Sequence, residues 1–352
     1  MQKSLKASLF LLFILAGLTL FVKPSGVLAA AAPDITTSPV SITLNAKPGT
    51  TTSTQLTVRN NGVLPVDMDI QVDTFKANGT TGQAQIQTPQ PNDQSINWVH
   101  FSQNSFTAQP NTWTYVQMTI SLPKSASLGY YYAVLFKPVV AVTPTGVNTN
   151  VIHGYNAVLV LLNALTANEH PQLQLASFSS DKKFYEYLPV TFSVNIHNNG
   201  NIYLPPSGDI YISRTSSFAN TIDTIHINPA IGNVLPGTNR IFTAKWADGF
   251  PVFEYKELDG QVINNKQGKP VEQLKWNFSQ IHKLRFGEYY ARLVMVYNNG
   301  VQDVPTTSVL SFWVVPWKMI LIMIFVLAFI GVGLWATIRT IVRRTKRLIR
   351  KK

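Results

Sequence analysis

Apolar and polar residues alternate along most of the chain. In residues 66–73 the even positions carry Val, Met or Ile, and the odd positions carry Asp or Gln. Successive side chains of a β-strand point to opposite faces, so this pattern predicts a strand with one buried and one solvated face. The same alternation recurs over Val116–Leu122, Val190–Ile196 and Ala291–Met295. Short strands of this kind, separated by turn residues such as Pro236-Gly237, predict an all-β region built of sandwiches.

A different pattern occupies the C-terminal part of the chain. Residues Met319–Ile338 contain no charged side chain, and 20 apolar residues in a helix span the roughly 30 Å hydrocarbon core of a bilayer. Trp317 and Trp335 lie near the two ends, where indole rings favour the membrane interface. Eight Lys and Arg residues then crowd positions 339–352. We therefore expect a transmembrane helix over 317–338, followed by a basic cytoplasmic tail over 339–352.

The N-terminal residues read as an export signal. Lys3 and Lys6 precede the apolar run Leu9–Phe21, and small residues follow at Ala29–Ala32. This order is typical of a signal peptide with its cleavage site, which we place over residues 1–32; an uncleaved anchor is the alternative. The expected product is a single-pass protein of the cell membrane, with its N-terminal domains extracellular and its C-terminus cytoplasmic.

The charge of the chain follows from this topology. The formal net charge is +12, from 29 basic and 17 acidic residues. After the cations of the signal, the span and the tail are set aside, 17 basic residues face 17 acidic ones in the expected ectodomain. The ectodomain is therefore formally neutral, and we expect no nucleic-acid partner.

The residues that usually carry chemistry are missing or scattered. The sequence has no cysteine, which excludes disulfides and thiol catalysis and points to a bacterial surface protein. Six histidines show no metal-ligand spacing, and neither a Gly-x-Ser-x-Gly motif nor a glycine-rich phosphate loop is present. Asp67, Asp69 and Asp73 share one strand face; Ca²⁺ ligation is conceivable there, but we expect a solvated face. The sequence predicts no enzyme, no cofactor and no metal site.

A short repeat divides the expected ectodomain in two. Asn60-Asn61-Gly62 and Asn198-Asn199-Gly200 each follow a strand pattern, 138 residues apart, which is about one domain length. A third copy, Asn298-Asn299-Gly300, suits a tight hairpin. The alternation breaks around Asn168-Glu169-His170-Pro171. We expect a first sandwich domain over 33–168 and a second over 169–316.

These turns and strands carry a resemblance to a known family. The segments Asn45–Gly49, Gln55–Asn60 and Leu128–Tyr131, with Asn198–Asn201 and Gly287–Tyr290 in the second half, are similar to the membrane-anchored WxL-interacting proteins of Gram-positive bacteria. The resemblance implies two tandem immunoglobulin-like β-sandwiches. It further implies that the first domain binds peptidoglycan or another wall polymer. The second would bind a partner, either a WxL-type or other surface protein or a host protein.

The segment Ala247–Phe286 is the most suggestive region for binding. It separates two strand patterns by 40 residues and is rich in aromatic residues, which often mark binding surfaces. The candidate partner-binding residues are Phe250, Phe253, Tyr255, Trp276 and Phe278. The alternative is an extra hairpin or short helix whose aromatic side chains cap the sandwich core, and the sequence favours this cap. A glycosidase pair of Glu254 with Glu272 is conceivable from residue type alone, and we do not expect it.

Three consecutive tyrosines raise a further possibility. Tyr130, Tyr131 and Tyr132 alternate on a predicted strand, so their rings point to both faces. Core packing accounts for one face, and an outward ring is a candidate for stacking on a ligand.

From these features we expect a protein that presents its two domains at the cell surface for binding and catalyses no reaction. The chain would be a non-enzymatic, membrane-anchored bacterial surface protein, active in adhesion, that binds wall polymer and a partner protein. The alternative keeps the same fold but acts in assembly. In that case the first sandwich would be a chaperone-like module that offers an edge strand to surface subunits by β-strand addition.

Overall fold

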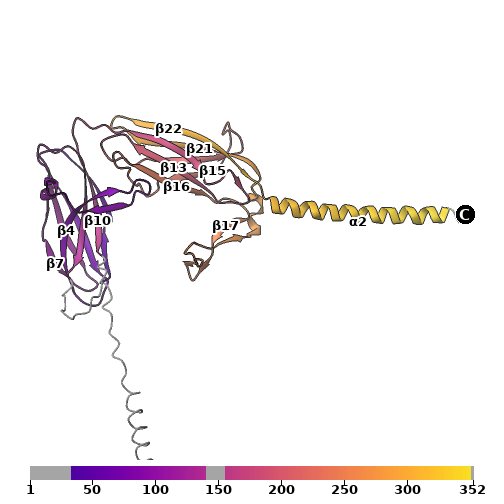
Figure 1. The fold of residues 1–352 in the computed structure, drawn as a ribbon, viewed down its shortest axis with the longest axis horizontal. Coiled ribbons are helices and arrows are strands. Elements are labelled where there is room, and N and C mark those ends of the chain that lie inside the picture. Colours follow the sequence, from indigo (N-terminus) through magenta and orange to yellow (C-terminus); the bar gives the residue numbers. More distant parts are fainter. Residues whose placement is uncertain (1–32, 140–154, 350–352) are drawn as a thin grey trace, which may run out of the picture.

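The computed structural model describes residues 33–139 and 155–349, which form two β-sandwiches followed by one long helix (Figure 1). The predicted signal peptide and the last three residues of the tail lie outside the described residues. The expected fold class is confirmed: the chain has two tandem immunoglobulin-like β-sandwiches and one C-terminal apolar helix.

The first sandwich pairs two sheets across a common core. One sheet has the order β1-β3-β8-β6, which comprises Ile35–Ser38, Thr51–Asn60, Trp113–Ser121 and Val99–Phe101. The other has the order β2-β10-β9-β4-β5, which comprises Ser41–Ala46, Asn156–Ala164, Leu128–Pro138, Val66–Ala77 and Ala84–Gln87. Strand β7 (Ser105–Ala108) also pairs with β4, and the 3-10 helix η1 (Gln94–Trp98) precedes β6. Because β1 and β2 belong to different sheets, the chain crosses between the sheets within two residues.

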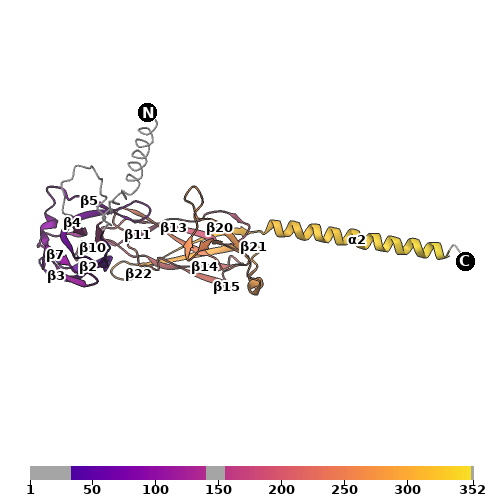
Figure 2. The ribbon, with the colours of Figure 1, turned by 90° about the horizontal axis from the view of Figure 1, so that it is seen from below.

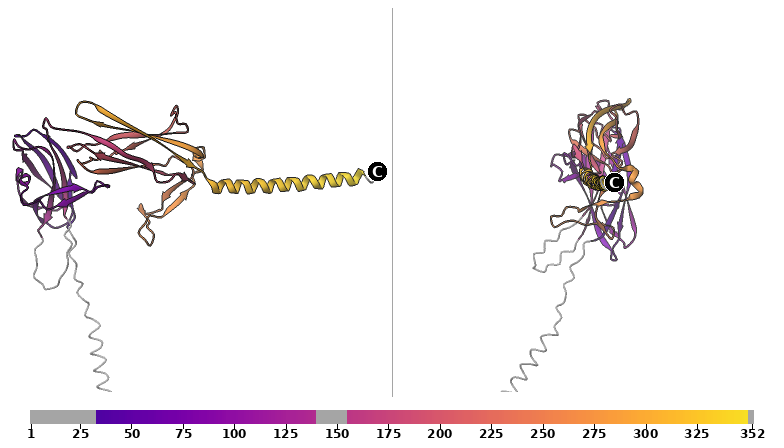
Figure 3. Two further views of the ribbon diagram at one scale, coloured as in Figure 1. Left: turned by 45° about the horizontal axis from the view of Figure 1, so that its top comes forward. Right: turned by 90° about the vertical axis from the view of Figure 1, so that its right-hand side faces the viewer.

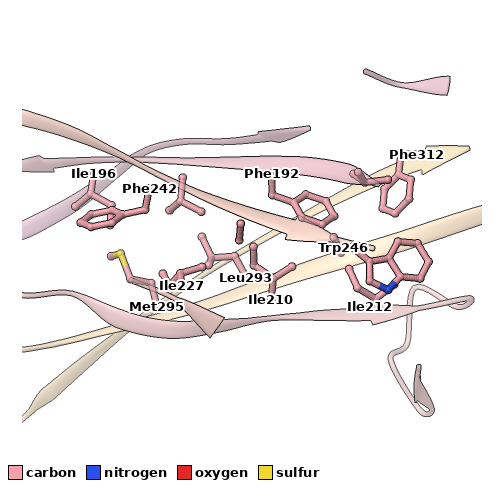
Figure 4. Close-up of a cluster of buried hydrophobic side chains, with 14 of the residues drawn as sticks. Phe192, Ile196, Ile210, Ile212, Ile227, Phe242, Trp246, Leu293, Met295 and Phe312 are labelled. Carbon is pink, nitrogen blue, oxygen red and sulfur yellow. The ribbon is translucent and has the colours of Figure 1, made fainter. Parts of the chain in front are cut away.

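The second sandwich repeats this plan. One sheet has the order β11-β13-β16, which comprises Leu173–Ser180, Val190–Asn198 and Asn239–Trp246. The other has the order β12-β22-β21-β14-β15, which comprises Phe184–Tyr185, Asp303–Val314, Gly287–Asn298, Ser207–Ser213 and Thr221–Ile227. Figure 4 shows Phe192 and Trp246 of the first sheet packed toward Phe312 of the second. The core is thus made from alternate residues of both sheets, as the period of two predicts.

A small apolar cluster joins the two sandwiches. Phe75, Leu135 and Leu161 of the first sandwich pack against Tyr203 and Leu235 of the second. Burial raises the pKa of the Tyr203 phenol to about 12. The outer face of the β4 sheet is therefore partly an interface rather than a solvated surface.

On this outer face of the β4 sheet, the alternation of the sequence predicts solvent exposure for residues that the structure covers. Asp73 was expected on a solvated face together with Asp67 and Asp69, but it is only 6% exposed. It accepts a hydrogen bond from Gln71 Nε2 at 2.7 Å. Tyr131, which also points outward from the first core, packs edge-on against Phe75 with ring centroids 5.9 Å apart. Its ring therefore contributes to the junction between the sandwiches and is not free to stack on a ligand.

A hairpin of the first sandwich reaches the edge of the second. The carbonyl of Thr80, in the turn between β4 and β5, accepts a hydrogen bond from the amide of Ile241 on β16 at 2.9 Å. A Cβ atom at Gly82 of the same turn would lie 2.6 Å from Nε of Arg240, so the turn and this side chain are in close contact. Arg240 Nη1 in turn donates to the carbonyl of Asn233 at 2.6 Å, and burial lowers the pKa of Arg240. This contact adds to the apolar cluster in holding the two sandwiches together.

The last strand passes almost directly into the helix. Strand β22 ends at Val314 and α2 (Trp317–Ile349) begins three residues later. The amide of Val315 donates to the carbonyl of Tyr185 at 2.7 Å, and Lys318 forms an ion pair with Glu186 at 2.8 Å. Residues Trp317–Ile341 of α2 are long and apolar enough to cross a membrane, and none of this stretch is buried. Beyond its first turn, the helix projects away from the sandwiches (Figure 3).

Candidate partner-binding site

Residues 247–286 fold into a small lobe at one end of the second sandwich. Strand β17 (Val252–Tyr255) pairs with β20 (Glu272–Lys275), and the short strands β18 (Glu257–Leu258) and β19 (Gln261–Val262) extend this hairpin. The 3-10 helix η2 (Phe278–Lys283) then leads back to β21. In Figure 1 the hairpin hangs from the end of the sandwich close to α2.

Charged side chains pin the two ends of this lobe together. Asp248 Oδ1 accepts from Lys283 Nζ at 2.5 Å, and Asp248 Oδ2 accepts from Arg285 Nη2 at 2.5 Å. Arg285 also donates to the backbone carbonyl of Asp248 and stacks over the ring of Trp246. Burial alone would raise the pKa of Asp248, but the hydrogen bonds and charges of Lys283 and Arg285 lower it below its ordinary value. These contacts join the first and last residues of the lobe, which form its base, and hold them against Trp246 of the sandwich core.

An aromatic cluster stands above this base. Phe250 is only 4% exposed and contacts Trp276 and Phe278, with ring centroids 5.7 and 5.5 Å apart. Tyr187 joins the cluster through Phe253 and Trp276. The outer rings remain accessible, with Trp276 44% and Phe278 67% exposed. Phe250 thus fills the interior of the lobe, whereas Trp276 and Phe278 form its surface.

A groove lies between the hairpin and the second sandwich. It has a volume of about 540 Å³ and is lined by residues of β16, β17 and β20 together with Pro189, Ala247 and Glu257. Lys245 Nζ donates to the hydroxyl of Tyr255 at 3.2 Å and lies 4.9 Å from the centre of its ring. Glu254 forms an exposed ion pair with Lys275 at 2.8 Å. The walls of the groove therefore combine aromatic surface with paired charges.

The open edge of β16 runs into this groove. Strand β16 is the outermost strand of its sheet. The amide of Ile241 points away from β13, since it donates to Thr80 of the other sandwich. In an antiparallel pair the direction of the backbone groups alternates, so those of Thr243 and Lys245 point the same way. Among the described residues, none forms a backbone hydrogen bond with the outward amides and carbonyls of Thr243 and Lys245. Lys245 also lines the groove.

The five residues predicted from the sequence separate into three environments. Phe253 and Tyr255 line the groove. Trp276 and Phe278 lie on the outer surface of the lobe, and Phe250 is buried beneath them. Sequence reasoning missed Lys245 and Pro189, which also line the groove. The sequence signals Lys245 only by its outward position in the alternation of β16, and it gives no signal for Pro189. Pro189 reaches the groove because the hairpin of β17 and β20, more than 60 residues later in the chain, folds back beside it.

The other residues considered from the sequence do not form a binding or catalytic site. Tyr132 is buried in the first core, where its ring is 6.4 Å from that of Tyr130. Glu254 and Glu272 both line the groove, but the carboxylate of Glu254 binds Lys275. Within residues 33–139 and 155–349, no three His, Asp or Glu side chains stand close enough to hold a metal ion.

Comparisons with known proteins place the chain in no family. No protein-family model matches it, and no curated protein matches it either. The expected membership of the WxL-interacting family is therefore wrong: the solved structures with a similar fold include bacterial chaperones, among them a fimbriae chaperone, instead. Binding to peptidoglycan or another wall polymer rested on that resemblance alone and loses its basis.

Three of these solved structures illustrate the similarity. The class 5 fimbriae chaperone CfaA is 15% identical, with 78% of this chain and 99% of that chain covered and a TM-score of 0.36. The Pseudomonas aeruginosa CupB2 chaperone is 10% identical, with 78% and 100% covered and a TM-score of 0.33. A chaperone–tip adhesin complex of CFA/I fimbriae is 17% identical, with 58% and 86% covered and a TM-score of 0.34. At this level of similarity, no argument about function rests on them.

Proposed function

We propose that this protein is a non-enzymatic, membrane-anchored assembly module that binds an extended segment of a surface protein by β-strand addition. The observation that supports the proposal is the open edge of β16 at Thr243 and Lys245, beside a groove lined by Phe253 and Tyr255. An added strand would pair with the free backbone groups, and the groove would accept its side chains. Backbone pairing supplies affinity in this mode of recognition, and side-chain pockets supply specificity.

The second sandwich fits this role better than the first. The edge strands β1, β5 and β6 of the first sandwich are three or four residues long. The edge strand β2 is longer, but Tyr203 of the second sandwich reaches the carbonyl of Leu44 on it, at 3.5 Å. Strand β16 has eight residues and is flanked by the Thr80 turn at one end and the groove at the other. We therefore assign subunit binding to β16, in contrast to the edge of the first sandwich that the sequence suggested.

The membrane anchor completes the proposal. Helix α2 would cross the membrane over Trp317–Ile341, with the sandwiches outside and the basic C-terminal end in the cytoplasm. The excess of Lys and Arg after the apolar stretch favours this orientation, because positively charged flanks are retained on the cytoplasmic side. We place the domain limits at 33–168 and 169–316, with the signal peptide removed. Anchoring would keep a bound subunit at the cell surface and raise its local concentration.

A proline substitution tests the strand-addition site. Peptides of about ten residues, with apolar side chains at alternate positions, would be selected from a library on the full-length protein in lipid nanodiscs. Thr243→Pro removes an outward amide that the sheet itself does not use, and edge strands tolerate proline at such positions. Loss of this bond and the steric block should weaken the selected peptides about tenfold or more, equivalent to about 1.4 kcal/mol.

Two further variants make the result decisive. Thr224→Pro, on the edge strand β15 of the opposite sheet, is the matched control and should leave affinity unchanged. Tyr255→Ala alters the groove without touching the strand edge and should also weaken binding. Equal peptide affinity for the parent and for both Thr243→Pro and Tyr255→Ala, with unchanged melting temperatures, would refute the proposal.

A further inference from the structure

Large apolar side chains are exposed together on the segment that leads into β21. Phe278 and Ile281 of η2 are 67% and 58% exposed, and Phe286, just before β21, is 53% exposed. Trp276 and Leu284 extend the same surface. We call this set, within residues 276–286, the apolar shoulder. Exposed apolar side chains that gather in one region mark interaction surfaces, and five of them lie within these eleven residues.

The strand register places the apolar shoulder at the end of the sandwich that carries α2. Gly287, the first residue of β21, pairs with Val314, the last residue of β22. Phe286 therefore stands at the level of Val315, two residues before α2 begins. Leu284 is also bridged to Phe250 at the base of the lobe. Figure 2 shows that the end of the second sandwich, where β21 begins, lies next to the start of α2.

The connection to α2 leaves little freedom for this end of the sandwich to move away. Only Val315 and Pro316 separate β22 from α2, and Val315 is tied to Tyr185 by a backbone hydrogen bond. Lys318 is held by Glu186, and the neighbouring Tyr187 contacts the ring of Trp276 at 6.4 Å. The apolar shoulder and the first turn of α2 are thus linked through a short run of contacts.

The bilayer must then lie close to the apolar shoulder. If the hydrocarbon core begins at Met319, Val315 stands about 6 Å above it at a rise of 1.5 Å per residue. The headgroup layer on each side of the core is about 5–8 Å thick. Side chains at the level of Val315 therefore lie among the headgroups, where aromatic and apolar side chains next to cations are stabilised. Lys283 and Lys318, which are paired with Asp248 and Glu186, place cations at the same end of the sandwich.

We infer that the apolar shoulder inserts into the outer leaflet and fixes the second sandwich against the membrane surface. The inference rests on the membrane span of the proposed function, but not on strand addition at β16. The occupant of this surface is lipid, because the span begins two residues after Val315, which stands at the level of Phe286, and so brings lipid there in every copy of the protein. The lobe then has two faces with different tasks: the groove faces a protein segment, and the shoulder faces the bilayer.

Depth-dependent quenching tests the inference in the full-length protein. The sequence has no cysteine, so Ile281→Cys, Phe278→Cys, Val301→Cys and Val332→Cys each introduce a single site for an environment-sensitive fluorophore. The proteins are reconstituted in vesicles of phosphatidylethanolamine and phosphatidylglycerol, with nitroxide quenchers either near the lipid headgroups or midway along the acyl chains, or with iodide in the water. Val301, 91% exposed in the turn at the other end of β21 and β22, is the matched control, and Val332 reports the span itself.

Each outcome decides the question. Lipid-borne quenching at 281 and 278 at least threefold stronger than at 301, with protection from iodide, supports the inference. Quenching at 332 combined with equal behaviour at 281, 278 and 301 overturns the inference and leaves the span intact. Absence of lipid quenching at 332 as well overturns both. Unchanged melting temperatures of the labelled variants exclude unfolding as the cause of any difference.

Discussion

Asn60 and Asn198 occupy equivalent positions in the two sandwiches. Each is the last residue of its strand and is fully buried. Asn60 Nδ2 donates to the carbonyls of Leu64 and Ala108, and Asn198 Nδ2 donates to those of Ile202 and Val234. In both cases the side-chain carbonyl accepts from the glycine two residues later. The Asn-Asn-Gly repeat is therefore a structural device that closes one corner of each sandwich.

Removal of the Asn198 amide should destabilise the second sandwich. Asn198→Ala leaves the carbonyl of Ile202 without its side-chain donor and takes one of two donors from the carbonyl of Val234, which keeps the amide of Leu204, at a cost of about 2 kcal/mol in the free energy of unfolding. Asn298→Ala is the matched control, because the third copy of the repeat is exposed and binds only Asp303 and its own turn. Denaturant unfolding of the full-length protein measures both. Equal effects of the two substitutions would contradict the assignment.

The base of the lobe should lose stability in acid. The pKa of Asp248 is lower in the folded protein than in the unfolded chain, so its ion pairs contribute fully above the ordinary Asp pKa of about 4. This contribution should vanish as the pH falls from about 4 through the lowered folded pKa. Asp248→Asn should therefore lower the melting temperature at pH 7 and remove part of its fall in acid. Asp69→Asn, at an exposed carboxylate, should preserve the acid profile of the parent protein.

The buried and exposed rings of the lobe should respond differently to truncation. Phe250→Ala removes a ring that is almost fully buried and should cost about 3 kcal/mol of stability. Phe278→Ala removes a largely exposed ring and should change the free energy of unfolding by about 0.5 kcal/mol or less. Chemical denaturation separates the two. A large loss of stability in both variants would show that Phe278 also caps the core.

Truncation of Tyr203 should loosen the junction between the sandwiches. The ring of Tyr203 packs against Phe75 and Leu135 of the first sandwich. Spin labels on Thr112→Cys and Val301→Cys, one in each sandwich, would report the distance between them by pulsed electron resonance. We expect a broader distance distribution in Tyr203→Ala and an unchanged one in Tyr211→Ala, which truncates a tyrosine outside the junction. An unchanged distribution in both would mean that the remaining contacts, Leu235 in the cluster and the Thr80 turn against β16, hold the sandwiches without Tyr203.

Local pattern was sufficient for the strands and the apolar helix. The even positions of β4 and the alternate residues of β13 face the cores as the period of two predicts, because burial of one sheet face is a requirement of any sandwich. The predicted family membership was wrong because its motifs also depend only on local structure. Its motifs were turns and strand ends, and those of Asn60 and Asn198 are explained by the closing of a sandwich corner, which needs no shared function.

The candidate site could be predicted only in part. Residue type and segment length pointed to Phe253 and Tyr255, which line the groove. The same criteria selected Phe250, although its ring fills the lobe, because composition does not distinguish an aromatic core from an aromatic surface. Lys245 and the open edge of β16 could not be found this way, since an edge is defined by the order of strands in a sheet.

The sequence by itself determined the all-β class, the repeat of the sandwich and the apolar stretch of α2, because each depends on the local order of apolar and polar residues. The tertiary structure decided which outward faces remain in water. It buries Asp73 and partly buries Tyr131 on a face that alternation marks as solvated, and it leaves Ile281 and Phe286 exposed where apolar residues would be expected inside. The physical reason is that burial depends on what packs against a face, and the segments that pack against these faces lie far away in the sequence.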